Sequence, residues 1–95
     1  MGEYGAFSLG MLYQSSGIAY AMKANIYFAK EIVQCLKKYS HGDWGDICGD
    51  DSDLNDKAVR NGERIFAKYN TMLGNIFIIT EPDRTATTIL FASEY

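Results

Sequence analysis

A β-hairpin is predicted by the C-terminal stretch IFIITEPDRTATTILF, residues 76–91. Ile76–Thr80 is a dense β-branched run, which is typical of a buried strand. Glu81–Arg84 places Pro82 at the second position of a predicted type I turn. In the returning strand, Thr85–Phe91, one face carries Thr87, Ile89 and Phe91, which alternate with Thr88 and Leu90 with a period of two. The C-terminal part of the chain is therefore predicted to be a pair of antiparallel strands.

The segments before the hairpin predict one further strand and two helices. Residues 5–13 alternate like a short strand, and Ile18–Tyr39 predicts a long amphipathic helix. Leu54–Tyr69 predicts a second helix, with Asp53 or Asn55 as its N-cap. The order β-α-α-β-β predicts an α+β fold, in which a three-stranded antiparallel sheet has both helices packed on one face.

Composition limits the architecture and the classes of partner. The chain has 95 residues, of which 47% are hydrophobic and 22% are charged, so a single domain over residues 1–95 is expected. Twelve acidic residues against nine basic ones give a net charge of −3, which argues against direct nucleic-acid binding. Two cysteines are too few for a disulfide framework, so a reducing cytoplasm is expected. Charges within Ile18–Tyr39 argue against a membrane span.

Three lysines recur at intervals of seven along the predicted long helix, at positions 23, 30 and 37. Such a row is typical of a solvated helix face. The functional alternative is contact with an anionic partner, which the nearby Glu31 makes less favourable.

Half of the acidic residues fall within residues 43–56, and they are Asp43, Asp46, Asp50, Asp51, Asp53 and Asp56. Together with His41 and Cys48 they bring an imidazole, a thiol and carboxylates into one short segment. We predict a divalent metal site with His41, Asp43, Asp46 and Cys48 as ligands, and zinc is favoured because it accepts N, S and O ligands. The alternative is that the aspartates cap the following helix and stay solvated, with Trp44 beneath the glycine turn.

An EF-hand and the common catalytic templates fit the sequence poorly. Asp51, Asp53 and Asn55 resemble the opening of an EF-hand loop, but Asp56 replaces its required glycine and Gly62 occupies its twelfth position. The chain contains no P-loop, no dinucleotide fingerprint and no nucleophile elbow. A Cys48–His41 nucleophile pair is conceivable, but no catalytic residue is assigned.

The candidate binding residues are Trp44, Asp50, Asp51, Asp53, Glu81, Asp83 and Arg84. The last three either stabilise the hairpin as an ion pair or lie beside the acidic loop.

Two motifs resemble a family of small bacterial proteins found on plasmids, prophages and conjugative elements. The first is Gly42-Asp43-Trp44-Gly45-Asp46-Ile47-Cys48, followed by Asp51, Asn55, Ala58, Gly62, Arg64 and Tyr69; the second is Ile79-Thr80-Glu81-Pro82-Asp83-Arg84-Thr85, followed by residues 87–90 and Glu94-Tyr95. The likeness covers roughly residues 36–95. The family pattern has a histidine at the place of Tyr39, which weakens any role carried over to His41. Pro82 and Thr85 replace alanine and serine, and both changes suit a turn.

The resemblance implies a protein of mobile elements with no established general activity. Such elements carry small proteins that disarm host defences, so we expect an anti-CRISPR-type inhibitor that binds a host CRISPR or restriction effector in the bacterial cytoplasm without catalysis. Four basic residues, at positions 57, 60, 64 and 68, interrupt the acidic character, which favours a site-specific or allosteric inhibitor over a DNA mimic. The alternatives are a small metal-dependent hydrolase that uses the Asp43–Cys48 loop, and a structural or regulatory module.

Overall fold

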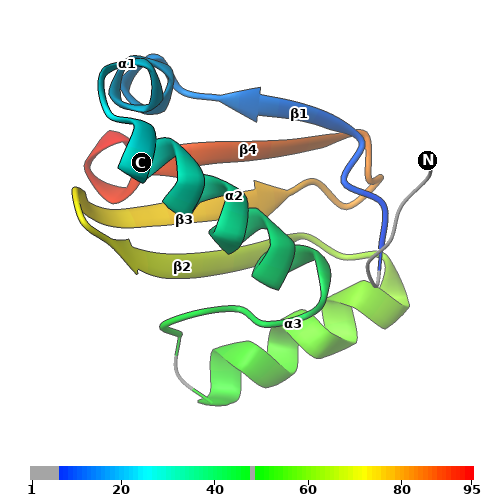
Figure 1. Ribbon diagram of the computed structural model, residues 1–95. Coiled ribbons are helices and arrows are strands. Elements are labelled where there is room, and N and C mark those ends of the chain that lie inside the picture. The colour runs from blue at the N-terminus through cyan, green and yellow to red at the C-terminus, as the bar shows by residue number, and fades with distance from the viewer. Residues whose placement is uncertain (1–6, 48) are drawn as a thin grey trace.

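One four-stranded sheet and three α-helices make up the computed structural model, which describes residues 7–47 and 49–95 (Figure 1). The elements in chain order are β1 (Met11–Gln14), α1 (Ser16–Ala24), α2 (Ile26–Ser40), α3 (Gly49–Asn61), β2 (Ile65–Thr71), β3 (Gly74–Thr80), β4 (Ala86–Phe91) and a final 3₁₀ turn, η1 (Ala92–Glu94). Helix α2 lies across one face of the sheet, and α3 runs beside strand β2 (Figure 1). The fold is α+β.

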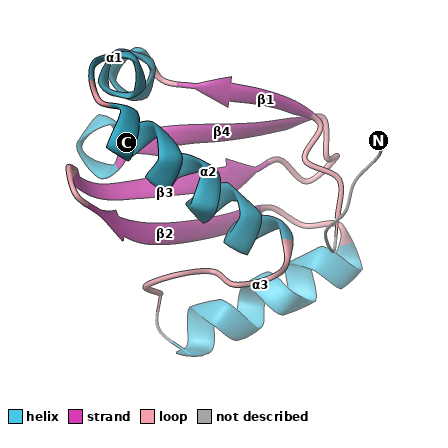
Figure 2. Ribbon diagram, in the orientation of Figure 1, coloured by secondary structure: helices cyan, strands magenta, loops and turns pink. Residues whose placement is uncertain are grey.

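The sheet has the strand order β1-β4-β3-β2 and is mixed (Figure 2). The predicted hairpin is confirmed, since β3 and β4 pair antiparallel with Ile78 opposite Ile89. The prediction of three antiparallel strands in the order β-α-α-β-β is wrong. Strand β1 pairs with β4 in parallel, and a further strand, β2, pairs with β3. The observed order is therefore β-α-α-α-β-β-β.

The predicted helix Leu54–Tyr69 is in fact the end of a helix and a strand. Helix α3 ends at Asn61, where Gly62 adopts a φ of 71° and the Glu63 N–H donates to the Ala58 carbonyl at 3.0 Å. This is the usual glycine-terminated helix end. Strand β2 then buries every second residue. Ile65 and Tyr69 lie four apart, a spacing that fits a helix as well as one face of a strand, which is why the pattern misled.

The predicted helix Ile18–Tyr39 is divided at Asn25, which has an extended backbone with φ −142°. The Asn25 side chain accepts hydrogen bonds from the N–H groups of Tyr27 and Phe28, at 3.0 and 3.2 Å, and so caps α2. The predicted strand over residues 5–13 is also shifted, because pairing with β4 begins at Met11. Residues 5 and 6 lie outside the described part.

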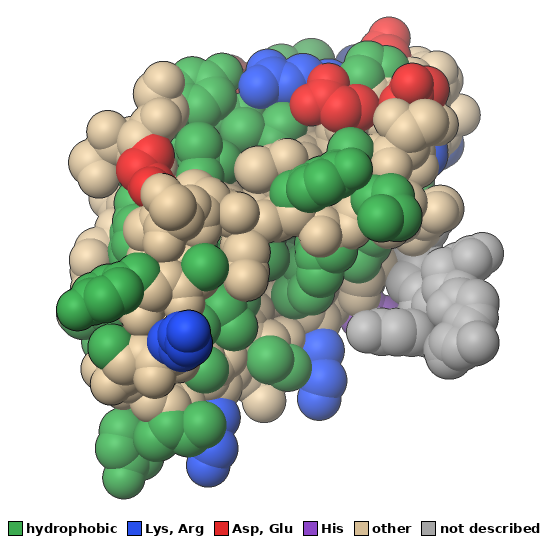
Figure 3. Space-filling view, turned by 90° about the horizontal axis from the view of Figure 1, so that it is seen from above, with side chains coloured by type: hydrophobic (Ala, Val, Ile, Leu, Met, Phe, Trp, Pro, Cys, Tyr) green, Lys and Arg blue, Asp and Glu red, His purple; other side chains and the backbone are tan. Residues whose placement is uncertain are grey.

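The core lies between α2 and the face of the sheet that α2 covers. Inward-facing residues of β2, β3 and β4 meet one side of α2, and the members of this core include Phe28, Ile32, Tyr39, Ile65, Ala67, Ile76, Ile78 and Ile89. Residues that alternate with them, such as Phe66, Phe77 and Leu90, point to the opposite face. No α-helix of the described residues lies across that face (Figure 1). Apolar side chains also gather along the β1 side of the molecule, which Figure 3 shows from above.

A row of hydroxyl groups crosses the buried centre of the sheet. The Thr87 hydroxyl donates to the Leu9 carbonyl at 2.7 Å, and it lies 2.8 Å from the Thr80 hydroxyl. The Tyr39 hydroxyl lies 2.6 Å from that of Thr80. Because each hydroxyl has one proton, the direction of the row is fixed: Tyr39 donates to Thr80, and Thr80 donates to Thr87. Burial raises the pKa of Tyr39, so its phenol keeps the proton that it donates.

This direction predicts unequal effects of removing the two ends of the row. Tyr39→Phe removes one donor and should lower the free energy of unfolding by about 1 kcal/mol. Thr87→Val should cost about 2–3 kcal/mol, because the Leu9 carbonyl loses its donor and Thr80 loses its acceptor. Urea unfolding of both variants measures the difference. Equal costs, or a larger cost for Tyr39→Phe, would contradict the assigned direction.

Candidate functional site

The loop that carries the first motif is docked on the edge of strand β2. The Asp46 N–H donates to the Lys68 carbonyl at 2.7 Å, and Gly45 forms an isolated parallel bridge with Lys68. Gly45 has a φ of 77°, and a Cβ atom there would overlap the Lys68 carbonyl oxygen. Glycine is therefore required at position 45 for the loop to lie this close to the strand.

Trp44 anchors this loop in the core. Its side chain is 3% exposed, with its ring centroid 5.5 Å from that of Tyr39 and 6.0 Å from that of Phe7. Its indole N–H donates to the Asp56 carboxylate at 2.9 Å. The residue predicted to bind a partner is therefore a packing residue, in agreement with the alternative that placed it beneath the glycine turn.

Asn55 fastens helix α3 to the same strand. Its side-chain amide donates to the Phe66 carbonyl at 2.7 Å and accepts from the Phe66 N–H at 3.1 Å. The amide thus replaces a neighbouring strand at this point of the β2 edge. Asn55 is 5% exposed, so both bonds are shielded from water.

Arg84 of the second motif fastens the C-terminal end of α3. One guanidinium nitrogen donates to the Ala58 carbonyl at 2.8 Å, and the other donates to the Glu63 carbonyl at 2.7 Å and the Glu81 carbonyl at 3.1 Å. These are carbonyls of the last turn of α3, of the residues after it, and of the β3–β4 turn. The guanidinium thus bonds to backbone oxygens, which differs from the predicted ion pair with the carboxylates of Glu81 and Asp83.

The two motifs meet at Phe7. The Arg84 guanidinium carbon lies 5.8 Å from the centre of the Phe7 ring, within the range of a cation–π contact, and Phe7 packs on Trp44. Segments that lie far apart in the sequence therefore hold one another through an aromatic residue near the N-terminus.

Asp43 and Asp83 shape their own turns. The Asp43 carboxylate accepts from the Gly45 N–H at 3.2 Å, and the Asp43 carbonyl accepts from the Tyr69 hydroxyl. The Asp83 carboxylate accepts from the hydroxyl and the N–H of Thr85, at 2.6 and 3.1 Å, and these bonds hold the pKa of Asp83 below its usual value. Both carboxylates thus stabilise local backbone.

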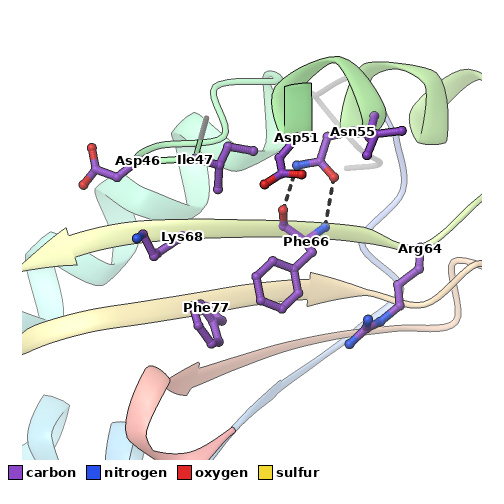
Figure 4. Close-up of a pocket in the computed structure, with 9 residues that line it drawn as sticks. Asp46, Ile47, Asp51, Asn55, Arg64, Phe66, Lys68 and Phe77 are labelled. Atoms are coloured by element: carbon purple, nitrogen blue, oxygen red, sulfur yellow. Dashed lines mark hydrogen bonds between the residues drawn. The ribbon is translucent and has the colours of Figure 1, made fainter. Parts of the chain in front are cut away.

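A groove of about 600 Å³ lies between α3, the docked loop and the outer face of β2 and β3 (Figure 4). Its floor is formed by Phe66 and Phe77, whose ring centroids are 4.6 Å apart. Tyr95 packs edge-on against both rings, at 5.6 and 5.3 Å. The remaining lining residues are Asp46, Ile47, Asp51, Leu54, Asn55, Arg64 and Lys68.

Opposite charges line the two sides of this groove. Asp46 and Asp51 come from the loop and the first turn of α3, whereas Arg64 precedes β2 and Lys68 lies on it. Arg64 is placed over the Phe66 ring at 5.7 Å and donates to the Tyr95 hydroxyl at 3.2 Å. An aromatic floor with an acidic and a basic margin can accommodate an apolar side chain together with polar groups on either side of it.

The other predicted binding residues lie outside the groove. Asp50 lies in the first turn of α3, where an acidic residue suits the positive end of the helix dipole, and Asp53 follows within the same helix. Both side chains are exposed. Glu81 and Asp83 are exposed in the β3–β4 turn. Of the predicted residues that the structure describes, Asp46 and Asp51 are the two that line the groove.

The predicted metal ligands do not converge in the described part of the chain. Over residues 7–47 and 49–95, no three His, Cys, Asp or Glu side chains are grouped so that they could hold a metal ion. His41 Nδ1 lies 2.8 Å from the Lys37 carbonyl, and Asp43 is engaged within its own turn. Cys48, both as a ligand and as a nucleophile paired with His41, lies outside the described residues. Elemental analysis of protein purified without added metal tests the predicted zinc site.

Phe66, Phe77 and Arg64 line the groove, and Tyr95 packs on its floor, but none of the four was predicted from the sequence as a site residue. The available signal was the alternation of residues 65–71, which places Phe66 and Lys68 on the face opposite Ile65. Once β2 is recognised as a strand, its outer residues become surface candidates.

No family model, no curated protein and no solved structure matches the chain. Among the described residues, no helix combines the length and the hydrophobicity that crossing a bilayer demands.

Proposed function

We propose that the protein is a non-catalytic binding protein that holds a partner protein in the groove over Phe66 and Phe77. One observation carries the proposal: the residues of both motifs are used to build this groove. The glycine turn and Trp44 fix the loop that bears Asp46 and Ile47. Asn55 fixes the middle of α3, and Arg84 fixes its C-terminal end. An aromatic floor below such margins is typical of a site that takes an apolar anchor residue of a partner.

The proposed partner is a nuclease of a bacterial defence system, either a CRISPR effector or a restriction enzyme. The likeness of both motifs to proteins of plasmids and prophages supports this choice, with the bacterial cytoplasm as the place of action. The net charge of the chain is −3, and the two basic residues of the groove are matched by two acidic ones, which supports contact with the nuclease protein over contact with its DNA.

Binding without catalysis predicts inhibition that is complete only near equimolar amounts of the inhibitor and the nuclease. The measurement is cleavage of target DNA by a panel of purified CRISPR and restriction effectors at increasing ratios of this protein, with gel filtration to detect the complex. Complete inhibition at a small fraction of equimolar would indicate an enzyme. Absence of both inhibition and complex formation across the panel would contradict the proposal.

Leu54→Glu tests whether the groove is the contact surface. Leu54 lines the groove and is 60% exposed, so the change should leave the fold intact. We expect affinity for the inhibited nuclease to fall at least tenfold, because a carboxylate would replace an apolar contact at a buried interface. Leu73→Glu is the matched control, since Leu73 is 48% exposed in the β2–β3 turn and does not line the groove. Equal affinities of the two variants would place the contact elsewhere.

A further inference from the structure

Strand β1 ends the sheet and leaves part of its backbone directed away from β4. The Met11 N–H donates to the Thr85 carbonyl and the Ser15 N–H to the Ile89 carbonyl, both at 2.9 Å. Alternate residues of a strand direct their N–H and C=O groups to opposite sides. The N–H and C=O groups of Leu12 and Gln14 therefore point to the outer edge, where no backbone hydrogen bond from the described residues reaches them.

The two edges of the sheet differ in whether other segments cover their backbone groups. On the β2 edge, the docked loop bonds to Lys68 and the Asn55 amide bonds to Phe66. Proteins commonly protect an edge by such cover or by charges, proline or bulges within the strand. Strand β1 has the sequence Met-Leu-Tyr-Gln, without charge or proline, and all four residues are exposed. It is an edge that can still accept another strand.

An apolar groove of about 330 Å³ adjoins this edge, between β1 and α2. Its lining includes Leu12, Met22, Val33 and Leu36. Figure 3 looks onto this side of the molecule, where apolar side chains run across the view and basic side chains lie beside them. The groove can take the inward-facing side chain of a strand added to β1.

Two lysines of α2 neighbour Val33, which lines this groove. Lys30 and Lys37 are exposed and stand three residues before and four residues after Val33, on the same face of the helix. Glu31 does not offset them there, because its carboxylate accepts from the Met72 N–H at the β2–β3 turn, at 3.0 Å. The margin of the groove is therefore basic, although the chain as a whole is acidic.

We infer that β1 accepts an extended acidic segment of a partner protein as a further strand. The backbone of that segment bonds to Leu12 and Gln14, and one apolar side chain enters the groove. The seven residues from Lys30 to Lys37 span about 10 Å along the helix, and four residues of a strand span about 13 Å. The geometry thus fits acidic residues two positions before and two positions after the apolar one, since these side chains can reach the lysines.

Charge argues against a second copy of this chain as the occupant. Antiparallel pairing of two β1 strands about a two-fold axis would place both α2 helices on the same side of a joined sheet. Lys30 and Lys37 of one copy would then face the same two lysines of the other copy. An acidic strand neutralises these lysines, whereas a second copy doubles the positive charge.

The probe is the blocked peptide Thr-Glu-Thr-Val-Thr-Glu-Thr, compared with its lysine analogue Thr-Lys-Thr-Val-Thr-Lys-Thr. We expect the acidic peptide to bind roughly tenfold more tightly than the lysine analogue at low salt, because it forms two surface ion pairs that the analogue cannot form. The difference in affinity should shrink at high salt, which screens these ion pairs. Amide resonances of Leu12 and Gln14 should shift on titration. An acidic peptide methylated on the backbone nitrogens that face β1 should not bind, because strand pairing needs those N–H groups.

Charge reversal provides the decisive control. The double variant K30E/K37E should prefer the lysine peptide, whereas K57E/R60E, with the same change in net charge on exposed residues of α3, should keep the preference of the original protein. Circular dichroism checks that both variants are folded. Equal binding of the two peptides, no binding at millimolar peptide, shifts confined to the groove over Phe66, or a concentration-dependent dimer with shifts at Leu12 would each overturn the inference.

Discussion

Trp44→Ala is expected to lower the free energy of unfolding by about 4 kcal/mol, as the loss of a large buried aromatic side chain does. The indole is 3% exposed, and it contacts the rings of Tyr39 and Phe7. Its removal opens a cavity and also leaves the Asp56 carboxylate without its indole donor.

The unfolding is best followed by far-ultraviolet circular dichroism in urea, because Trp44 is the only tryptophan and its fluorescence is lost in the variant. Trp44→Phe separates the two contributions, since it retains much of the packing but loses the bond to Asp56. We expect it to cost about half as much as Trp44→Ala. Tyr27→Ala, at a tyrosine that is 69% exposed, is the control and should change stability by less than about 0.5 kcal/mol. A cost below about 1 kcal/mol for Trp44→Ala would show that the indole does not anchor the loop.

Asn55→Leu is expected to cost about 3 kcal/mol, although it exchanges side chains of similar size. The N–H and the C=O of Phe66 would both lose their partner at a shielded point of the β2 edge, and each buried polar group left without a bond costs about 1–3 kcal/mol. Because Asn55 joins α3 to β2, we also expect α3 to loosen and the groove to lose its wall.

Urea unfolding and amide hydrogen exchange measure these two effects. The Phe66 N–H should exchange much faster in Asn55→Leu than in the original protein, and binding of the partner nuclease should weaken in parallel. Asn70→Leu, at an exposed position of the same strand, is the matched control. Unchanged protection of the Phe66 N–H would mean that the side-chain amide is not what holds α3 in place.

A helix or strand could be predicted where one local sequence pattern was enough to identify it. The hairpin of β3 and β4 follows from two branched runs around Pro82, and the structure has it with the N–H of Arg84 donating to the Glu81 carbonyl. Residues 65–69 were wrongly assigned to a helix because the spacing of Ile65 and Tyr69 fits either periodicity. Gly62 decides between helix and strand, because its left-handed backbone ends α3 before residue 65.

The candidate site was only partly predictable. The motif residues are conspicuous in the sequence, but their side chains are mostly directed inward, as those of Trp44, Asn55 and Arg84 are. Their burial depends on partners that are remote along the chain, so no local pattern reveals it. The surface that they build uses Phe66 and Phe77, which the sequence presents as ordinary strand residues.

The sequence by itself determined the α+β class, the C-terminal hairpin and the concentration of aspartates in residues 43–56, because each depends on neighbouring residues or on composition. Tertiary structure decided the rest. Parallel pairing of β1 with β4 joins Leu12 to Thr87, and the guanidinium of Arg84 reaches α3. Contacts between residues so far apart in the sequence form only when the whole chain folds around one core. These contacts place Asp46 and Asp51 of the acidic segment at the side of the groove.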